Sequence, residues 1–176
     1  MTKRWIYSDP HYFHTNIIRY TSRPFETIEH MNEELIKRHN SKVGKKDTVI
    51  IAGDFSLGGK AETEKVVSRL KGRKILIMGN HDKARSRNWW LNVGFDEVIK
   101  FPIIVNQFFI ISHEPVFLND SMPYVNFHGH IHSQLITGGN YFNVCGEHND
   151  FYPHDLDKLI GGKVSYEQSP KDINSM

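Results

Sequence analysis

The 176-residue sequence contains a single cysteine, no long apolar segment and only a small net charge. Because Cys145 has no partner, an intrachain disulfide is excluded and a reducing compartment is favoured. Nothing approaches the roughly 18 consecutive apolar residues of a membrane-spanning helix, and the N-terminus has no apolar core of a secretory signal. We therefore expect a cytoplasmic protein without a membrane anchor. The formal net charge of +2 does not by itself indicate a nucleic-acid-binding protein.

Linkers rich in proline or serine, internal repeats and low-complexity segments are also missing, so we predict one domain over residues 1–176. Hydrophobic residues make up 39% of the chain and charged residues 24%, which is usual for a globular protein with a buried core. The charge is uneven, because residues 60–87 contain nine lysines or arginines and three acidic residues. This basic segment is either the solvated face of a helix or a contact for nucleic acid.

Short apolar runs with little polar alternation predict strands that are covered on both faces. They occupy residues 5–7, 49–52, 75–78, 108–111 and 125–127, and further strands are expected in 98–111, 141–144 and 163–166. The spacing of apolar residues predicts helices over 27–42, between the glycines at 58–59 and 72, and over 85–92. Strands alternating with helices and followed mostly by strands predict an α/β fold in which sheets pack between helices.

Each of five predicted strands is followed by residues that can bind a metal or move a proton. The clusters are Asp9-Pro10-His11, Gly53-Asp54, Gly79-Asn80-His81-Asp82, Ser112-His113-Glu114 and His128-Gly129-His130-Ile131-His132. In α/β sheets, ligand sites form at the carboxyl ends of strands, and the glycines permit the tight turns that such a site needs. If residues 130 and 132 continue a strand, both histidines face one side of it. Each cluster alone is a weak signal, but the five together predict one site.

The order of these clusters resembles the calcineurin-like metallophosphoesterase superfamily, and the resemblance extends from Asp9 to His132. It implies a four-layer αββα sandwich with two mixed β-sheets and helices outside. It also implies a pair of divalent metal ions, with Asp54 bridging them and His81 as a catalytic histidine that binds neither. The ligands implied for one ion are Asp9, His11, Asp54 and His132, and those for the other are Asp54, Asn80, His113 and His130.

The chemistry implied by this resemblance is hydrolysis of a phosphate ester. A bridging carboxylate can hold two cations about 3.5–4 Å apart. Imidazole, carboxylate and amide ligands without thiolate suit Mn²⁺, with Fe, Zn²⁺, Ni²⁺ and Co²⁺ as alternatives. A metal-bound hydroxide attacks phosphorus, and His81 assists the leaving group. The predicted enzyme is a metal-dependent phosphoric ester hydrolase, either a phosphodiesterase or a phosphatase.

Departures from the superfamily pattern bear on the substrate. Its protein serine/threonine phosphatases carry Gly-Asp-x-x-Asp-Arg-Gly, whereas this chain has Leu57 in place of the second Asp and lacks the Arg. A phosphoprotein substrate is therefore not expected, and His81 lacks the carboxylate that would orient it. The short chain also leaves little material for a lid. We expect a phosphodiester or a small phosphomonoester, with a nucleotide or nucleic acid among the candidates and no protein partner inferable.

Residues 14–25 resemble a feature of small bacterial and phage-type members of the superfamily. His14 could contact the site or the substrate and Arg23 a phosphate, or the segment could be a loop with its polar residues exposed. In the second interpretation, Ile17, Ile18 and Phe25 pack the loop. Residues 149–153 are expected to be structural. We expect His128 to be a neighbour of the ligands, and surface or capping roles for His30, His39, His148 and His154.

Three alternative functions stay open. A scaffold that has lost catalysis normally lacks ligands, and here none of the implied positions is missing. A nuclease or RNA-processing enzyme would use the same metals, and it rests on the basic segment 60–87. A structural zinc protein is disfavoured, because such sites use closely spaced ligands that include cysteine.

Overall fold

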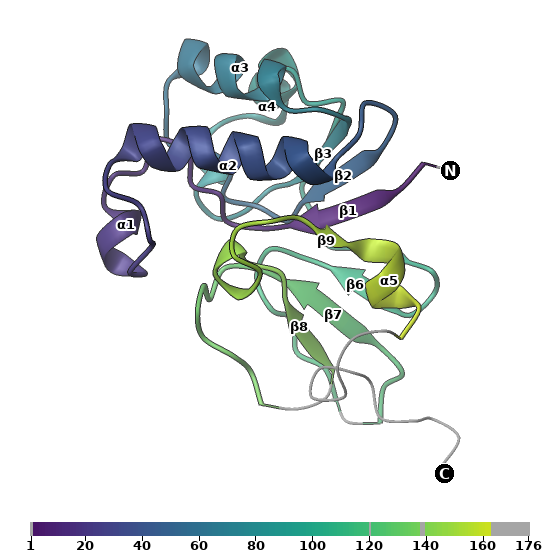
Figure 1. The fold of residues 1–176 in the computed structure, drawn as a ribbon. Helices are drawn as coiled ribbons and strands as arrows, with labels where there is room; N and C mark the ends of the chain where they lie inside the picture. The colour runs from purple at the N-terminus through teal and green to yellow at the C-terminus, as the bar shows by residue number, and fades with distance from the viewer. Residues whose placement is uncertain (1, 120, 138–139, 163–176) are drawn as a thin grey trace.

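The computed structural model describes residues 2–119, 121–137 and 140–162, which form two mixed β-sheets packed face to face (Figure 1). The first sheet has the strand order β4-β3-β2-β1-β9, and the second has the order β5-β6-β7-β8. Strands β1 to β4 are parallel and β9 is antiparallel to β1, whereas β6 to β8 are parallel and β5 is antiparallel to β6. The strands are β1 (Arg4–Tyr7), β2 (Thr48–Ile51), β3 (Arg73–Ile77), β4 (Glu97–Ile99), β5 (Ile103–Val105), β6 (Phe109–Ile111), β7 (Val125–His128), β8 (Tyr141–Asn143) and β9 (His154–Asp155).

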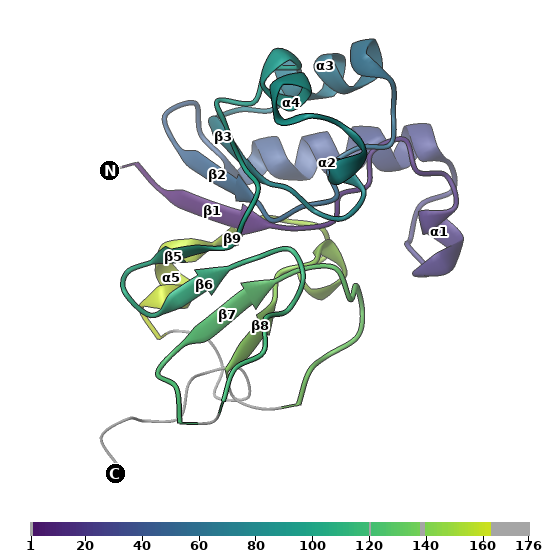
Figure 2. The same cartoon turned by 180° about the vertical axis from the view of Figure 1, so that it is seen from behind.

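The helices are α1 (Ile17–Tyr20), α2 (Ile28–Lys42), α3 (Lys60–Arg69), α4 (Arg87–Asn92) and α5 (Leu156–Ile160). Figure 2 shows α2, α3 and α4 on the side of the first sheet that faces away from the second sheet. Alternation along β1 explains the two cores, because successive side chains of a strand point to opposite faces. Trp5 and Tyr7 pack into the core beneath the helices, whereas Ile6 packs into the core between the sheets. The predicted α/β class with two packed mixed sheets is confirmed.

The predicted helix boundaries are close to those in the structure. Helix α2 begins after Thr27, whose hydroxyl accepts a hydrogen bond from the backbone N–H of His30. The third predicted helix begins two residues late, at Arg87, because the Ser86 hydroxyl caps it by accepting from the N–H of Trp89. The strand predicted over 163–166 lies outside the described residues. None of the helices in the described ranges is long and apolar enough to cross a membrane.

The expected surface position of His39 is wrong. Its side chain lies on the buried face of α2, one turn after Leu35, and only 2% of its surface is exposed. The ring nitrogen Nε2 donates to the carbonyl oxygen of Lys71 over 2.9 Å, and Nδ1 lies 3.3 Å from the Tyr7 hydroxyl. Burial lowers the pKa of His39 to about 4, so the ring is neutral in the folded protein near neutral pH.

Acidification is expected to destabilise the metal-free fold through His39. Between pH 6.5 and about 4 the unfolded chain binds a proton at this residue and the folded chain does not, so stability is lost as the pH falls. A shift of this size corresponds to about 3 kcal/mol at most. Denaturant unfolding of the metal-free protein across this interval measures the loss. His39→Gln should flatten the pH dependence, whereas His30→Gln, on the exposed side of the same helix, should not; equal slopes in all three proteins would contradict the assignment.

Candidate metal centre

The seven predicted ligands lie together at the carboxyl ends of β1, β2, β3, β6 and β7. The strand register places Tyr7 beside Ile51 and Ile51 beside Leu76, so the segments that follow these three strands leave the first sheet next to one another. At the same end, a parallel bridge between Ser8 and Cys145 joins the two sheets. The segments after β6 and β7 are therefore held against those of the first sheet, as the polar residues at the predicted strand ends indicated.

Five of the predicted ligands have a left-handed backbone conformation, which most residues avoid. They are Asp9 (φ 56°), His11 (φ 53°), Asp54 (φ 52°), His130 (φ 70°) and His132 (φ 49°). Strand β7 ends at His128, so the expectation that His130 and His132 share a face of a continuing strand is wrong. Their left-handed turns bring the two rings to the site instead. Residues held in such conformations by their surroundings cluster at functional sites.

The carboxylate of Asp54 lies between two groups of side chains. Its Oδ1 accepts a hydrogen bond from the backbone N–H of His81 over 2.9 Å, which fixes the orientation of the carboxylate. Its Oδ2 is 3.7 Å from Nε2 of His11 on one side and 3.5 Å from Nε2 of His113 on the other. One oxygen atom is thus shared by both groups.

The first group consists of Asp9, His11 and His132, of which Asp9 and His11 lie close to the Asp54 carboxylate. Oδ1 of Asp9 is 3.4 Å from Nε2 of His11 and 3.9 Å from Nε2 of His132. Both Asp9 Oδ1 and His11 Nε2 are buried without a hydrogen-bond partner in the described residues. Unpaired buried polar atoms are costly, and a divalent cation between them would satisfy both. This group therefore fits a metal ion.

The other oxygen of Asp9 is already engaged. Oδ2 accepts hydrogen bonds from the Ser8 hydroxyl, from the backbone N–H of His130 over 2.8 Å and from the Cys145 thiol over 3.2 Å. Burial raises the pKa of Cys145 well above its ordinary value, so the thiol stays protonated and acts as a donor to the carboxylate. These contacts aim Oδ1 at the two histidine rings and leave it free.

The second group consists of Asn80, His113 and His130. Nε2 of His113 is 2.9 Å from Oδ1 of Asn80 and 3.2 Å from Nδ1 of His130. Nδ1 of His113 donates to the carbonyl oxygen of Ala52 over 2.9 Å, so Nε2 carries the lone pair that faces the group. Asn80 and His130 are exposed, whereas the first group is mostly buried. The second group is therefore the side of the site open to solvent.

The protonation states of the buried pair suit metal binding. Burial by itself raises the pKa of Asp9, but the adjacent His11 ring, 3.4 Å away, and the nearby His113 and His132 hold it well below its ordinary range. Burial lowers the pKa of His11. An ionised carboxylate and a neutral imidazole are the forms that bind a divalent cation.

Asp82 organises the backbone beneath the site, although it has no role in the predicted ligand set. Its buried carboxylate accepts the backbone N–H groups of Asp54 over 2.7 Å, Phe55 over 3.0 Å and Gly79 over 2.9 Å. It therefore ties the segment after β2 to the segment after β3. Burial raises the pKa of Asp82 to about 7, and the nearby charge of Asp54 contributes to the rise. The sequence places it next to His81, but only the three-dimensional contacts show what it holds.

Gly79→Ala is expected to destabilise the site. A methyl group at this position collides with the Asp54 carboxylate and lies 2.6 Å from the Asp54 backbone nitrogen, which cannot move without breaking its bond to Asp82. Overpacking of this kind costs about 1–3 kcal/mol. Denaturant unfolding and Mn²⁺ titration measure the two losses. Gly59→Ala is the control, because its nearest neighbour is a flexible Glu62 side chain at 3.5 Å; equal behaviour of the two variants would contradict the prediction.

His81 lies at the edge of the groups and not within them. Its side chain is 45% exposed, and its Nε2 is 3.9 Å from Oδ2 of Asp54. In the described part of the chain, Asp54 is the carboxylate within ion-pair distance of this ring. Leu57, which replaces the orienting Asp of the protein phosphatases, is partly exposed. The backbone N–H bond to Asp54 holds the main chain of His81, and its ring packs against the rings of His11 and His14, with centroid distances of 5.5 and 6.1 Å.

Neither interpretation of residues 14–25 describes Arg23, which is buried and faces no open phosphate site. It is 4% exposed and donates to the carbonyl oxygens of Asp9 over 2.7 Å and Pro10 over 2.9 Å.

His14 does contact the site, with its Nδ1 3.3 Å from Nδ1 of His11. His128 is buried, and its Nδ1 donates to the carbonyl oxygen of Gly129 over 3.0 Å. His148 is half-buried, and its Nε2 donates to the His132 carbonyl oxygen over 2.7 Å.

A cleft of ≈ 580 Å³ opens over the groups. Helix α1, which lies beyond the carboxyl end of β1 in Figure 1, forms one wall of this cleft. Tyr20 on α1 is 73% exposed, and its ring meets that of His14 edge to face. The lining consists of His11, His14, Ile17, Tyr20, Thr21, His81, His130, Ile131, His132, Ser133 and Gln134.

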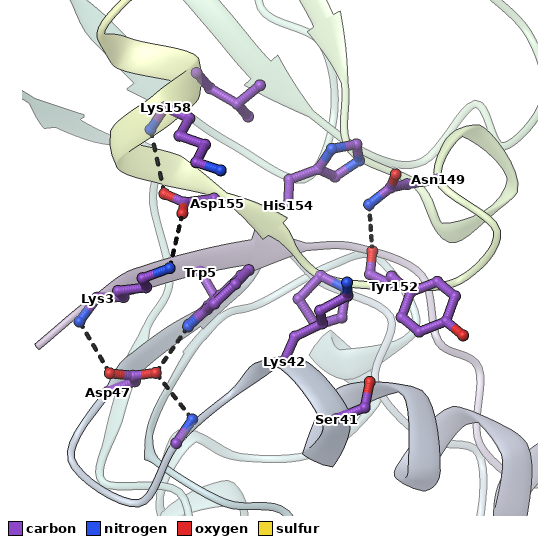
Figure 3. Close-up of a pocket in the computed structure, with 13 residues that line it drawn as sticks. Lys3, Trp5, Ser41, Lys42, Asp47, Asn149, Tyr152, His154, Asp155 and Lys158 are labelled. Atoms are coloured by element: carbon purple, nitrogen blue, oxygen red, sulfur yellow. Dashed lines mark hydrogen bonds and ion pairs between the residues drawn. The ribbon is translucent and has the colours of Figure 1, made fainter. Parts of the chain in front are cut away.

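A separate groove of ≈ 830 Å³ lies between the end of α2, β1 and β9 (Figure 3). Its carboxylates are engaged by neighbouring groups. Asp47 accepts from the backbone N–H groups of Lys3 and Gly44 and from the indole of Trp5, and Asp155 lies 3.6 Å from the Lys3 ammonium group. In this groove, hydrogen bonds and an ion pair connect β1 and the preceding Lys3 to the neighbouring segments. None of the predicted metal ligands lines it.

Comparisons with known proteins agree with this architecture. The uncharacterized protein MJ1445 of Methanocaldococcus jannaschii is 38% identical over 176 residues, which covers 91% of this chain and 90% of that protein. The gene 66 protein of Mycobacterium phage L5 is 37% identical over 91 residues, which covers 50% of this chain and 44% of that protein. The crystal structure of AQ665, a protein of unknown function from Aquifex aeolicus, matches with a TM-score of 0.70 and 23% identity. It covers 92% of this chain and 99% of that chain, and at this identity it supports the fold alone.

The names of these relatives state no activity, whereas the matching family profile does. The profile described as calcineurin-like phosphoesterase matches residues 2–172. Metal-dependent hydrolysis of phosphate esters is the general activity of this family, and the chain carries candidate ligand groups for a metal. Because the profile spans nearly the whole chain, the protein belongs to the calcineurin-like phosphoesterase family.

Proposed function

We propose that this protein is a phosphodiesterase that uses two divalent metal ions held by the seven predicted residues. The observation that carries the proposal is the position of Asp54 Oδ2 between His11 and His113, where one oxygen can bridge two cations. The ligand sets are those implied by the family resemblance. One consists of Asp9, His11, Asp54 and His132, and the other of Asp54, Asn80, His113 and His130. Mn²⁺ is the proposed metal, and Fe, Zn²⁺, Ni²⁺ and Co²⁺ suit the same donors.

When bound, the ions supply Lewis-acid activation of the phosphoryl group and of the attacking water. The chain supplies the remaining functions. Asp9 and Asp54 provide fixed negative charge, and the Asp54 carboxylate is oriented by the N–H of His81. The ring of His81 lines the cleft, so in its protonated form it can give the Nε2 proton to the leaving oxygen. His81 is therefore the proposed general acid.

The cleft favours a diester over a small monoester as the substrate. None of the eleven residues that line it is a lysine, arginine, aspartate or glutamate. An ester with a second, uncharged substituent can place that substituent against Ile17, Tyr20 and Ile131. A monoester leaves this apolar surface unused. A small phosphomonoester is the weaker candidate.

The structure does not strengthen the nuclease alternative. Several basic residues of the segment 60–87 already pair with acidic groups outside it. Arg69 lies 2.6 Å from Glu33, and Arg73 lies 2.7 Å from Glu97. These pairs reduce the positive charge that the segment offers to a nucleic acid. A cytoplasmic location stays a prediction from the single cysteine.

The proposal is tested with bis-p-nitrophenyl phosphate and p-nitrophenyl phosphate on protein reconstituted with Mn²⁺. We expect two ions per chain and a higher kcat/KM for the diester. Removal of metal by a chelator should abolish hydrolysis, and added Mn²⁺ should restore it. Two bound ions with no hydrolysis of either ester would contradict the proposal and favour a scaffold. Binding of an RNA oligonucleotide that weakens steeply with salt would favour the nuclease.

A further inference from the structure

We infer that Arg23 and Glu147 are positioning residues for one of the two metal ions, a role that rests on the proposed function. Glu147 holds the ring of His132 so that Nε2 faces the metal, and Arg23 holds both Glu147 and the backbone of Asp9. The two residues are 124 positions apart in the sequence, and both side chains are buried. They connect two of the ligands proposed for the same ion.

The contact of Glu147 with His132 selects the form of the ring. Oε1 of Glu147 lies 3.2 Å from Nδ1 of His132, and the carboxylate can only accept at this position. The proton of a neutral His132 ring is then on Nδ1, and Nε2 carries the lone pair. Nε2 lies 3.9 Å from Oδ1 of Asp9, the buried oxygen that has no hydrogen-bond partner in the described residues. Histidines that bind metals are commonly oriented by such a carboxylate on the other nitrogen.

The guanidinium of Arg23 connects this pair to Asp9. It donates from Nε and Nη2 to Oε1 of Glu147, over 3.0 Å and 2.8 Å. Nη2 also donates to the carbonyl oxygen of Asp9, and Nη1 donates to that of Pro10. Because Asp9 has a left-handed backbone, its orientation needs support from outside its own segment. One planar group with several fixed donors can hold both the carboxylate and the two carbonyl oxygens.

The charges of the pair support the same role. The guanidinium of Arg23 lies 2.8 Å from Oε1 of Glu147, so a permanent positive charge lies beside the buried carboxylate. The carboxylate therefore stays ionised and remains an acceptor. Arg23 compensates its charge, so the pair adds no net charge beside the metals.

Mn²⁺ titration of the metal-free protein tests the inference through Glu147→Gln. We expect one ion to bind about 10- to 100-fold more weakly and the other to change by less than about threefold. Asp150→Asn is the matched control, because it removes a carboxylate on the same segment that pairs with Arg38 at 2.9 Å. Adding Glu147→Gln to His132→Gly, which deletes the ring but tolerates the left-handed backbone, should weaken Mn²⁺ binding no further. If the wild-type protein binds no Mn²⁺, the proposed function fails; if it binds two ions and Glu147→Gln binds both equally well, this inference alone fails.

Arg23→Lys tests the other residue of the pair. An ammonium group cannot reach Glu147 and both carbonyl oxygens at once, so lysine should not restore wild-type affinity. We expect the same single ion to be weakened by about 10-fold or more. Unchanged binding of both ions in Arg23→Lys would overturn the role of Arg23.

The position of the proton on the His132 ring distinguishes the two possible roles of Glu147. If Glu147 only stabilised the fold, it would not determine which ring nitrogen carries the proton. A long-range ¹H–¹⁵N spectrum of the metal-free wild-type protein, recorded at a pH where the His132 ring is neutral, identifies this nitrogen without the constraint that a bound metal would impose on the ring. We expect His132 to carry its proton on Nδ1. A proton on Nε2 would overturn the inference. The measurement needs no variant, so it decides the question even if substitutions at Arg23 and Glu147 prevent folding.

Discussion

Asp54→Asn is expected to lose both metal ions and nearly all hydrolysis. The amide oxygen can still accept from the N–H of His81, but an NH₂ group then replaces Oδ2 between His11 and His113. That group has no lone pair for a cation, and both proposed ligand sets lose their shared member. Metals of this kind contribute several kcal/mol to catalysis, so kcat/KM should fall by about 10³-fold or more. Metal analysis after Mn²⁺ reconstitution measures occupancy, and diester hydrolysis measures the rate.

Asp96→Asn is the matched control for this substitution. Asp96 is an exposed aspartate before β4 that accepts the backbone N–H of Lys74 and lies outside the candidate centre. It should keep both metal ions and full activity. If Asp54→Asn retained two ions per chain, the bridging position proposed for Asp54 would be wrong.

His81→Ala is expected to keep both metal ions and lose most of the turnover. Its ring lines the cleft but lies outside both proposed ligand sets. Loss of a general acid lowers kcat by about 10²- to 10⁴-fold. The loss should be larger for a phenyl than for a p-nitrophenyl leaving group, because the poorer leaving group depends more on protonation. Steady-state kinetics with a series of substituted phenyl diesters measures this dependence.

His30→Ala is the control for His81→Ala, since His30 is an exposed histidine on α2. It should leave kcat and its dependence on the leaving group unchanged. Full hydrolysis by His81→Ala would remove this histidine from the mechanism. An equal loss for all leaving groups would show that His81 stabilises charge on the phosphoryl group and does not protonate the leaving oxygen.

The sequence predicted the parts of the structure that depend on local patterns. The helix over 27–42 has a capping threonine and a regular apolar face, and both signals act within a few residues. The polar residues after each apolar run indicated the site, because the carboxyl ends of parallel strands share one edge of a sheet. The buried position of His39 follows the same helical spacing as Leu35, but a histidine on an apolar face gives no sign of its partner Lys71.

Contacts between distant segments could not be predicted from these patterns. Arg23 looks like a surface arginine in its own segment, and its burial depends on Glu147, far along the chain. Asp82 holds backbone N–H groups of two other segments, and no spacing in the sequence identifies them. The predicted face shared by His130 and His132 assumed that β7 continues, whereas the chain leaves the sheet after His128. The alternation of polar and apolar side chains does not show that the backbone at His130 and His132 is left-handed.

The left-handed backbone at five of the proposed ligands limits which residues those positions tolerate. Aspartate and histidine enter this conformation more readily than most residues, and glycine enters it without strain. An alanine scan of the centre therefore removes a ligand and adds backbone strain in one step, so it overstates the role of the side chain. Glycine at Asp9 or His132 deletes the ligand while keeping the turn. The same constraint means that grafting this centre onto another protein requires the turns to be transferred together with the side chains.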